Sequence, residues 1–444
     1  MLELSIPDDY TAVVGLTRLW GSLNDLPADG TGIFILLKQA NNLMGKQLPP
    51  VLRDSVLGLQ LSYFGDYPDP SDLVPSIIFA IAFFIFLCAH MFIYIMNYSR
   101  GHYFNISLCA AFYCLVRTLA FSLRAAWSQD ITKGRIGVAG EVFLILAPVI
   151  PVSFNLILAQ RIFAWRHPVK GSSKLFWYGT FLLFGLVLVF IATNIVAGAV
   201  PVMYFLSEVV RKRYIICLQA SSILIIINSL RAASLLLSTF IIRPNEKEKH
   251  LYTYQPWWIE SFGIFYYVKS GEAQKAAATF SRRNSNHRHA IRVIAATHHN
   301  YSMVEGLSNQ RGDLKHNHSM LIILISTVLL VAGAILRCIV MFQARIQKDT
   351  SSLGKPIAMY ICYGLLEVFN NILYLVGRID LRFYKPDRLP NDIKYMVSVQ
   401  PTANQSDVEV EYFDISGERT PIDNVSSFAT EKEMTDDDDN EFRF

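Results

Sequence analysis

The chain has 444 residues, of which 52% are hydrophobic and 17% are charged, and its net charge is +4. Because soluble domains carry about 25% charged residues, this composition indicates a protein embedded in a membrane. The excess positive charge lies between an acidic start and an acidic end, and no helix-turn-helix or aromatic–basic groove pattern accompanies it. We therefore expect membrane lipids as partners and no nucleic acid.

Residues 1–75 are polar and acidic, with prolines at positions 49, 50, 68 and 70. The first residues lack the basic start and the apolar stretch of about 7–15 residues that a cleavable signal peptide needs, so we expect the first span to act as its own signal. The sequence predicts an extracytoplasmic N-terminal cap for residues 1–75, placed over the mouth of a helical bundle.

Seven apolar runs follow, at residues 76–97, 104–123, 137–163, 175–200, 214–242, 319–342 and 356–376. A hydrocarbon core of about 30 Å needs about 17–25 residues of helix, which these runs supply. None of them alternates like a barrel strand, and open sheet edges cannot face lipid. The fold class predicted is therefore an all-α membrane protein with seven transmembrane helices, five in residues 76–242 and two in residues 319–377.

Lysine and arginine near the ends of the runs predict the orientation. One side of the membrane collects fifteen of them and the other side nine. Because the richer side stays cytoplasmic, we expect the N-terminus outside and the C-terminus inside. The six cysteines all lie within apolar runs, so we expect buried thiols and no disulfide framework.

Three further segments lie on the side predicted to be cytoplasmic. Residues 243–318 are too long and too rich in aromatic residues for an unstructured connection, which predicts a structured cytoplasmic loop between helices 5 and 6. Residues 378–394 form a juxtamembrane basic segment. Residues 395–444 hold thirteen acidic residues and predict a disordered acidic tail.

Polar residues inside the apolar runs are the candidate ligand-binding residues. Glu367 lies in the seventh run, followed one turn later by Asn370 and Asn371. From the helix rise, Glu367, Arg117 and Glu141 fall in one layer, so Arg117 could pair with either carboxylate. Two interpretations stay open: a buried ion pair that only fixes the helix register, and the floor of a cavity that binds the polar head of an amphipathic ligand.

The cytoplasmic end of the third helix carries Asn155, Gln160 and Arg161. Its cations fit positive-inside anchoring, and they equally fit a switch that meets a cytoplasmic signalling partner. Candidate partner contacts also come from the long loop, where the two tryptophans are expected at the membrane interface: Trp257, Trp258, Arg288 and Arg292.

Histidine pairs in the long loop raise the question of zinc. The pairs lie at positions 287/289, 298/299 and 316/318, but no cysteine and little carboxylate lies nearby to complete a tetrahedral site. We expect no metal and no cofactor. HExxH, GxSxG and Walker A patterns are absent from the sequence, so we expect a protein that is not an enzyme.

Several segments resemble a fungal family of seven-helix proteins that is loosely labelled "family C-like G-protein-coupled receptor". The resemblance covers about residues 74–390 and is carried by NYSRGHYF, NLILAQRIFAWRHP, YQPWWIESF, the histidine-bearing loop and GRIDLRFYKPDRLP, at residues 97–104, 155–168, 254–262, 287–317 and 377–390. It implies a receptor. The helical layout is also similar to the RTA-like lipid-translocating exporters, which implies lipid handling.

Three functions follow from these observations. The first is a non-enzymatic receptor-like protein that binds or senses an amphipathic ligand in the bundle and signals through the long loop. The second is a lipid transporter or exporter of the RTA-like type. The third is a membrane scaffold in which the polar layer is purely structural. In each case we expect an integral protein of the plasma membrane or of an endomembrane.

Overall fold

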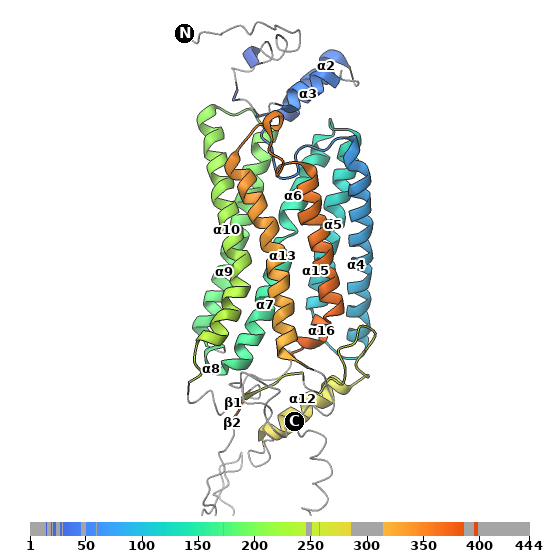
Figure 1. Ribbon diagram of the computed structural model, residues 1–444, viewed down its shortest axis with the longest axis vertical. Coiled ribbons are helices and arrows are strands. Elements are labelled where there is room, and N and C mark those ends of the chain that lie inside the picture. The colour runs from blue at the N-terminus through green and yellow to red at the C-terminus, as the bar shows by residue number, and fades with distance from the viewer. Residues whose placement is uncertain are drawn as a thin grey trace, which may run out of the picture.

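The computed structural model shows a bundle of helices that stand side by side along its longest axis (Figure 1). It describes residues 27–28, 30–45, 50–58, 60–171, 173–245, 251–256, 258–285, 314–385 and 395–397, with a few positions before residue 27. Seven helices in this part of the chain are long and apolar enough to cross a membrane. They confirm the predicted fold class, whereas the predicted orientation stays a prediction.

The seven spans coincide with the seven apolar runs, and most extend a few residues beyond them. Backbone hydrogen bonds continue a helix past the point where lipid ends, because they do not require apolar side chains. The elements of the spans are η1 Pro70–Asp72 with α4 Leu73–Ser99, α5 Ile106–Gln129, α6 Gly134–Leu146 with α7 Val149–Arg166, α9 Lys174–Met203, α10 Glu208–Ile241, α13 His316–Gln343, and α14 Pro356–Met359 with η5 Tyr360–Leu365 and α15 Leu366–Val376.

Two spans are not continuous α-helices. The third breaks between α6 and α7 at Ala147 and Pro148, where the sequence predicts loosening because proline lacks a donor for the preceding turn. The seventh contains η5, a π-helical turn between α14 and α15. Such turns are rare and occur often at functional sites.

The second and third spans lie at the centre of the bundle. In the most apolar 18-residue stretch of each of these two spans, 56% is buried inside the protein, whereas only 22% is buried in the corresponding stretches of α9 and α10. α5 packs on α4 and α6, and α10 packs on α7, α9 and α13. The central helices therefore face protein on most sides and can carry polar side chains away from lipid.

One end of the bundle, here called the cap end, carries α2 Ile33–Met44 and α3 Pro50–Gly58 (Figure 1). Ile33 and Leu37 of α2 share an apolar cluster with Trp127 of α5 and Val202 of α9. Residues 60–69, here called the cap segment, come next, and their backbones bond to residues 345–354; one such bond joins the Ser62 amide to the Arg345 carbonyl at 2.8 Å.

The opposite end, here called the loop end, carries short elements from the connection between the third and fourth spans, from the long loop and from the chain after the seventh span. They are α8 Pro168–Gly171, α12 Glu272–Ser285, α16 Ile379–Arg382 and an antiparallel ribbon of β1 Leu251–Thr253 with β2 Tyr395–Val397. Ile259, Phe262 and Val268 pack with Leu381 in one apolar cluster. This part of the loop is therefore folded against the bundle.

Candidate functional site

Three arginines are among the largest fully buried side chains of the described residues: Arg117, Arg124 and Arg378. They lie in the middle of the bundle, toward the cap end and at the loop end. A buried cation is costly unless a carboxylate and further hydrogen bonds satisfy it. Each of the three has such partners, so each marks a polar centre.

Arg117 of α5 forms the central ion pair with Glu367 of α15. Its Nε donates to Glu367 Oε2 at 2.5 Å, and its Nη2 donates to Oε1. The side chains are 0% and 3% exposed. The Tyr113 hydroxyl donates to the same carboxylate. Of the two partners that the sequence offered to Arg117, the structure selects Glu367.

The break in the third span supplies another acceptor for Arg117. Pro148 has no amide hydrogen, so it cannot bond to the Leu144 carbonyl one turn earlier. Arg117 Nη1 instead donates to this carbonyl at 3.4 Å. The Arg117 guanidinium also lies over the ring of Tyr363 in η5, 4.6 Å from its centroid. Both helix irregularities therefore contact the central cation.

The two predicted asparagines lie beside this ion pair and are fully buried. Asn371 donates to the Glu367 carbonyl at 2.8 Å and accepts from the Cys114 thiol at 3.2 Å. Neither amide atom of Asn370 has a hydrogen-bond partner within the described part of the chain. The pockets described below do not include these residues. These contacts fit the buried ion pair of the first interpretation, and the cavity floor of the second stays a prediction.

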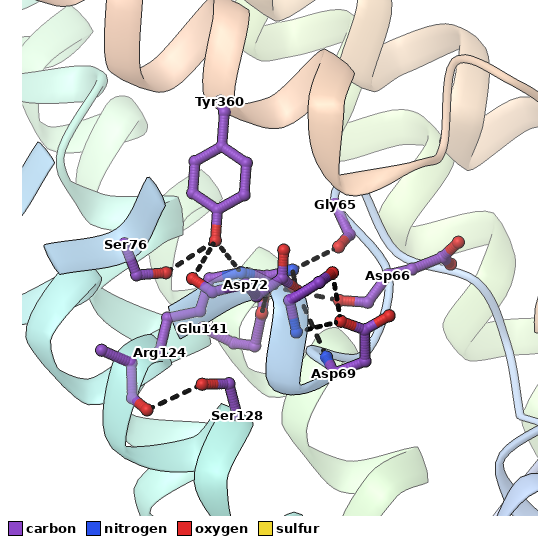
Figure 2. Close-up of polar contacts among 11 residues, drawn as sticks. Gly65, Asp66, Asp69, Asp72, Ser76, Arg124, Ser128, Glu141 and Tyr360 are labelled. Atoms are coloured by element: carbon purple, nitrogen blue, oxygen red, sulfur yellow. Dashed lines mark hydrogen bonds and ion pairs between the residues drawn. The ribbon is translucent and has the colours of Figure 1, made fainter. Parts of the chain in front are cut away.

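Arg124, two turns further along α5, is the centre of a second polar cluster (Figure 2). Its Nη2 donates to Asp72 Oδ2 at 3.0 Å and to the Gly65 carbonyl at 2.5 Å, and its Nη1 donates to the Asp66 carbonyl at 3.2 Å. Its Nε donates to the Tyr360 hydroxyl at 3.3 Å. Arg124 therefore joins the cap segment and the first, second and seventh spans.

Gly65 fits this cluster because it has no side chain. Its φ of +101° lies in a region that other residues rarely adopt, and a Cβ would come within 2.9 Å of Met359. The backbone can therefore turn its carbonyl toward Arg124. Tyr360 completes the cluster: its hydroxyl donates to the Asp72 carbonyl at 3.2 Å and lies 2.6 Å from the Ser76 hydroxyl, as Figure 2 shows.

Glu141 belongs to this second cluster and not to the central layer. Its Oε1 lies 3.6 Å from Arg124 Nη1, which corrects the prediction that it shares a layer with Arg117 and Glu367. α5 extends to Gln129 and the third span begins at Gly134, so Glu141 lies farther toward the cap end than the apolar runs indicated.

Glu141 lines a partly open pocket at the cap end, here called the cap pocket. The centre of a water molecule can occupy about 40 Å³ of this pocket. On the same measure, one bound water needs about 10–15 Å³. The polar part of its lining comes from Glu141 and from Tyr63, Asp66 and Tyr67 of the cap segment. The apolar part comes from Trp127, from Val138, Val142 and Ile145 of α6, and from Ile195, Gly198, Ala199 and Val202 of α9.

The polar groups of the cap pocket differ in how they are satisfied. The Tyr63 hydroxyl donates to the Gly198 carbonyl at 3.1 Å, whereas the buried Tyr67 hydroxyl has no hydrogen-bond partner among the described residues. Burial raises the pKa of both phenols, so both remain protonated. Burial also raises the pKa of Asp66, against the opposing hydrogen bond from Ser62. The Glu141 side chain is 27% exposed.

A second, smaller pocket lies next to the cap pocket, and Ile145 lines both. Arg337 of α13 lines the second pocket and donates to Asn194 Oδ1 of α9 at 3.0 Å. The two pockets therefore form a series that leads from the cap end toward the middle of the bundle, with the Ile145 side chain between them.

At the loop end, Arg378 has a left-handed backbone (φ +45°) and forms a bidentate pair with Asp380, with both bonds at 2.9 Å. Asp380 also accepts from Asn97 Nδ2 at 2.7 Å. Burial alone would raise the pKa of Asp380, but the hydrogen bonds and charge of Arg378 hold it below its usual value. Burial lowers the pKa of the adjacent His102 to about 4, although Asp380 favours its charged form.

Two of the predicted partner contacts, Asn155 and Gln160, are buried. Asn155 is 1% exposed and donates to Ser326 Oγ at 2.6 Å, and Gln160 donates to Thr180 Oγ1 at 3.0 Å. Arg161 donates to the Phe383 carbonyl and covers the ring of Phe104. Asn155 and Gln160 are buried and Arg161 is half-buried, and their role as partner contacts stays a prediction. These side chains hold the loop end together, because each bonds to another helix or to the segment after the seventh span.

Trp258 packs edge to face on Tyr384, with ring centroids 5.8 Å apart, and is therefore held against the bundle by protein contacts. Trp257, Arg288 and Arg292 lie outside the described residues, as do the histidines at 287, 289, 298 and 299. Within the described ranges, no group of three or more histidine, cysteine, aspartate or glutamate residues could hold a metal ion.

Sequence reasoning missed two of the three arginine centres. Arg124 lies one residue beyond the apolar run 104–123, yet it is 1% exposed. Tyr113, Arg117 and Arg124 recur at helical spacing on one face of α5, and this period is the signal that could have found it. Arg378 offered no such signal, because its partners include backbone carbonyls of the loop.

No curated protein and no solved structure matches the chain. A family model matches about half of it. Residues 168–384 match the model of a family described as "Protein of unknown function (DUF3112)". The match begins after α7 and includes the fourth to seventh spans, the long loop and the Arg378 centre. Over these residues the chain is similar to a family whose description states no activity.

Proposed function

We propose that this seven-helix membrane protein is a non-enzymatic, receptor-like protein that binds the polar head of an amphipathic ligand in the cap pocket. The carrying observation is Glu141, a partly exposed carboxylate in a mostly apolar pocket and only 3.6 Å from the buried Arg124. Ligand pockets combine an apolar lining with a few polar groups that fix orientation. The unpaired Tyr67 hydroxyl offers a second such group.

The size of the cap pocket limits the ligand. A cavity of about 40 Å³ holds a small polar head and not a whole lipid. Because the lining on α6 and α9 is apolar and α9 is one of the least buried spans, the chain of the ligand continues along α9 into the bilayer. An amphipathic molecule with a compact head is the class that fits.

Ligand binding at Glu141 can reach the seventh span through a short series of contacts. Glu141 pairs with Arg124, and Arg124 donates to the Tyr360 hydroxyl at 3.3 Å. Tyr360 begins η5, which ends two residues before Glu367. A ligand that competes for Glu141 therefore changes the charge balance of Arg124, and the seventh span carries this change toward Arg378 and the loop end. A signalling partner would meet the protein there.

Photolabelling tests the proposal. The full chain is reconstituted in nanodiscs and labelled with a panel of clickable photoreactive amphipaths: a fatty acid, a long-chain alcohol, a long-chain amine and a sterol. We expect one probe to label peptides of α6 and α9, with several-fold less labelling in Glu141→Gln and Tyr67→Phe. Glu208→Gln is the matched control, since Glu208 is 52% exposed at the cap end. Equal labelling in all variants would refute the cap pocket as the site.

The second candidate function is lipid transport of the RTA-like type, and the series of two pockets favours it. In that case Ile145→Trp, which places a larger side chain between the pockets, should stop movement of a labelled lipid across a proteoliposome membrane. In the receptor, the same variant should leave the transbilayer distribution as in empty liposomes. A membrane scaffold would show neither labelling at the cap pocket nor transport.

A further inference from the structure

Residues 263–267, here called the aromatic arch, wrap around the guanidinium of Arg378. Arg378 Nη1 donates to the carbonyls of Gly263 and Ile264, both at 3.1 Å, and to that of Tyr266. Because these carbonyls point inward, the side chains between them are directed away from the arginine. Ile264 is 47% exposed and Phe265 is 91% exposed.

The arch is held firmly at both of its ends. Phe262 before it and Val268 after it are buried in the cluster that contains Leu381. Phe265 is therefore displayed on a fixed turn. A phenylalanine left in water loses the stabilisation that its burial would give, so a fixed turn that exposes Ile264 and Phe265 together indicates a surface that covers them.

The position of the arch identifies that surface. The Tyr267 ring contacts the Phe92 ring of α4 edge to face, with centroids 6.2 Å apart. Phe92 is 54% exposed and shares the lipid-facing side of α4 with Ile85 and Ile95. It lies seven residues before the end of α4, which is about 10 Å along the helix axis. Tyr267 therefore reaches the level of lipid, and Figure 1 shows the loop rising beside the lower end of α4.

The charges around the arch fit the boundary of a bilayer. The Arg100 guanidinium lies 5.5 Å from the centroid of the Tyr267 ring, and Lys269 is exposed two residues later. Aromatic rings flanked by basic side chains are typical of the zone where headgroups meet acyl chains, and anionic lipids attract such cations.

We propose that the aromatic arch inserts Ile264 and Phe265 into the monolayer at the loop end, beside α4, and so anchors the long loop to the membrane surface. The lipid-facing side of α4 continues through Tyr267 onto the arch, which favours lipid over a protein partner as the covering surface. This anchor is independent of any ligand in the cap pocket.

Site-specific crosslinking tests this anchor. A benzoylphenylalanine introduced at position 265 in the full chain, in nanodiscs of phosphatidylcholine and phosphatidylserine, should give mainly lipid adducts on irradiation. The same group at position 275 on α12, where Lys275 is 74% exposed, is the control and should give several-fold fewer. Adducts at 265 to a second copy or to another protein, or equal lipid labelling at both positions, would overturn the proposal.

A second measurement does not need the crosslinker. Ile264→Ser with Phe265→Ser keeps the bonds from Arg378 to the arch, because those bonds use backbone carbonyls. In nanodiscs, we expect the amides of residues 263–268 to exchange with deuterium several-fold faster in this variant than in the natural protein, while Lys275→Ser on α12 leaves the exchange of these residues unchanged. Unchanged exchange in the double variant would show that lipid does not cover the arch.

Discussion

Arg117 of α5 and Glu367 of α15 lie 250 positions apart in the chain and form a two-pronged ion pair at membrane depth. The pair ties the second span to the seventh, and Tyr113, Tyr363 and the Leu144 carbonyl surround it. A carboxylate in lipid keeps its charge only with such neighbours. The pair therefore belongs to the packing of the bundle.

The first prediction concerns the loss of one partner. Glu367→Gln leaves the Arg117 charge buried without a counterion, and breaking a buried pair in this way costs about 3–5 kcal/mol of folding free energy. We expect a clearly lower unfolding midpoint in micelles, measured by thermal or denaturant unfolding. Arg117→Met combined with Glu367→Gln removes both charges and should regain at least half of the loss. A double variant no more stable than the single one would contradict this account.

A second prediction concerns the arginine that holds the cap segment. Arg124→Lys keeps a cation but loses the planar fork that reaches Asp72 and two backbone carbonyls at once. Leaving such buried acceptors unpaired costs about 1–3 kcal/mol. Hydrogen exchange of residues 60–72 should become faster, whereas Lys133→Met at the same end, where the side chain is 57% exposed, should change nothing. Equal exchange in both variants would be inconsistent with this role of Arg124.

The folded protein should also become less stable as the pH is lowered, because a histidine is buried at the loop end. Burial lowers the pKa of His102 to about 4, below the value of about 6.5 in an unfolded chain. The unfolded state therefore binds the proton first, and native stability declines as pH falls from about 6.5 to 4, by about 3 kcal/mol in total. Asp380, whose pKa is lowered, adds a loss at still lower pH.

The variant that checks the origin of this decline is His102→Phe. The new ring can still stack on Tyr384, whose ring centroid is 4.0 Å from that of His102, but it does not titrate. Unfolding midpoints measured between pH 7 and 4 should then fall less steeply than in the natural protein. Parallel pH profiles would show that another group causes the decline.

The last prediction concerns the support of the aromatic arch. Arg378→Lys cannot bond to Asp380 with two parallel bonds and to the arch carbonyls at the same time. Residues 258–270 should exchange hydrogen faster, and the cap end should be unaffected. Lys275→Met on α12 is the control. If exchange rises equally at both ends, the variant has loosened the whole bundle and the local role is wrong.

The seven spans were predictable because bilayer thickness sets a length that hydropathy reveals directly. Their ends were less accurate, and this error displaced Glu141. α5 continues from Leu123, where its apolar run ends, to Gln129, and six residues of helix correspond to about 9 Å. A depth counted from the run therefore places Glu141 beside Arg117, although it pairs with Arg124, two turns further along.

The ion pair of Arg117 and Glu367 could be predicted from the energetic cost of isolated charges in lipid. The contacts of Arg378 could not, since they depend on a left-handed backbone and on carbonyls of a distant loop. Partner contacts were assigned to Asn155 and Gln160 because polar residues near a helix end suggest a surface. Their burial follows from the neighbouring helices, which a one-dimensional pattern does not reveal.

The π-helical turn η5 sets the angle between the two ends of the seventh span. If the same residues formed a regular α-helix, Tyr360 would lie about 100° further around the axis relative to Glu367, because a π-helical turn holds one residue more than an α-helical turn. The ion pair with Arg117 would persist while the Tyr360 hydroxyl left Arg124 and Ser76. One extra residue in a single turn thus keeps two buried arginines, on the same face of α5, bound to the same helix.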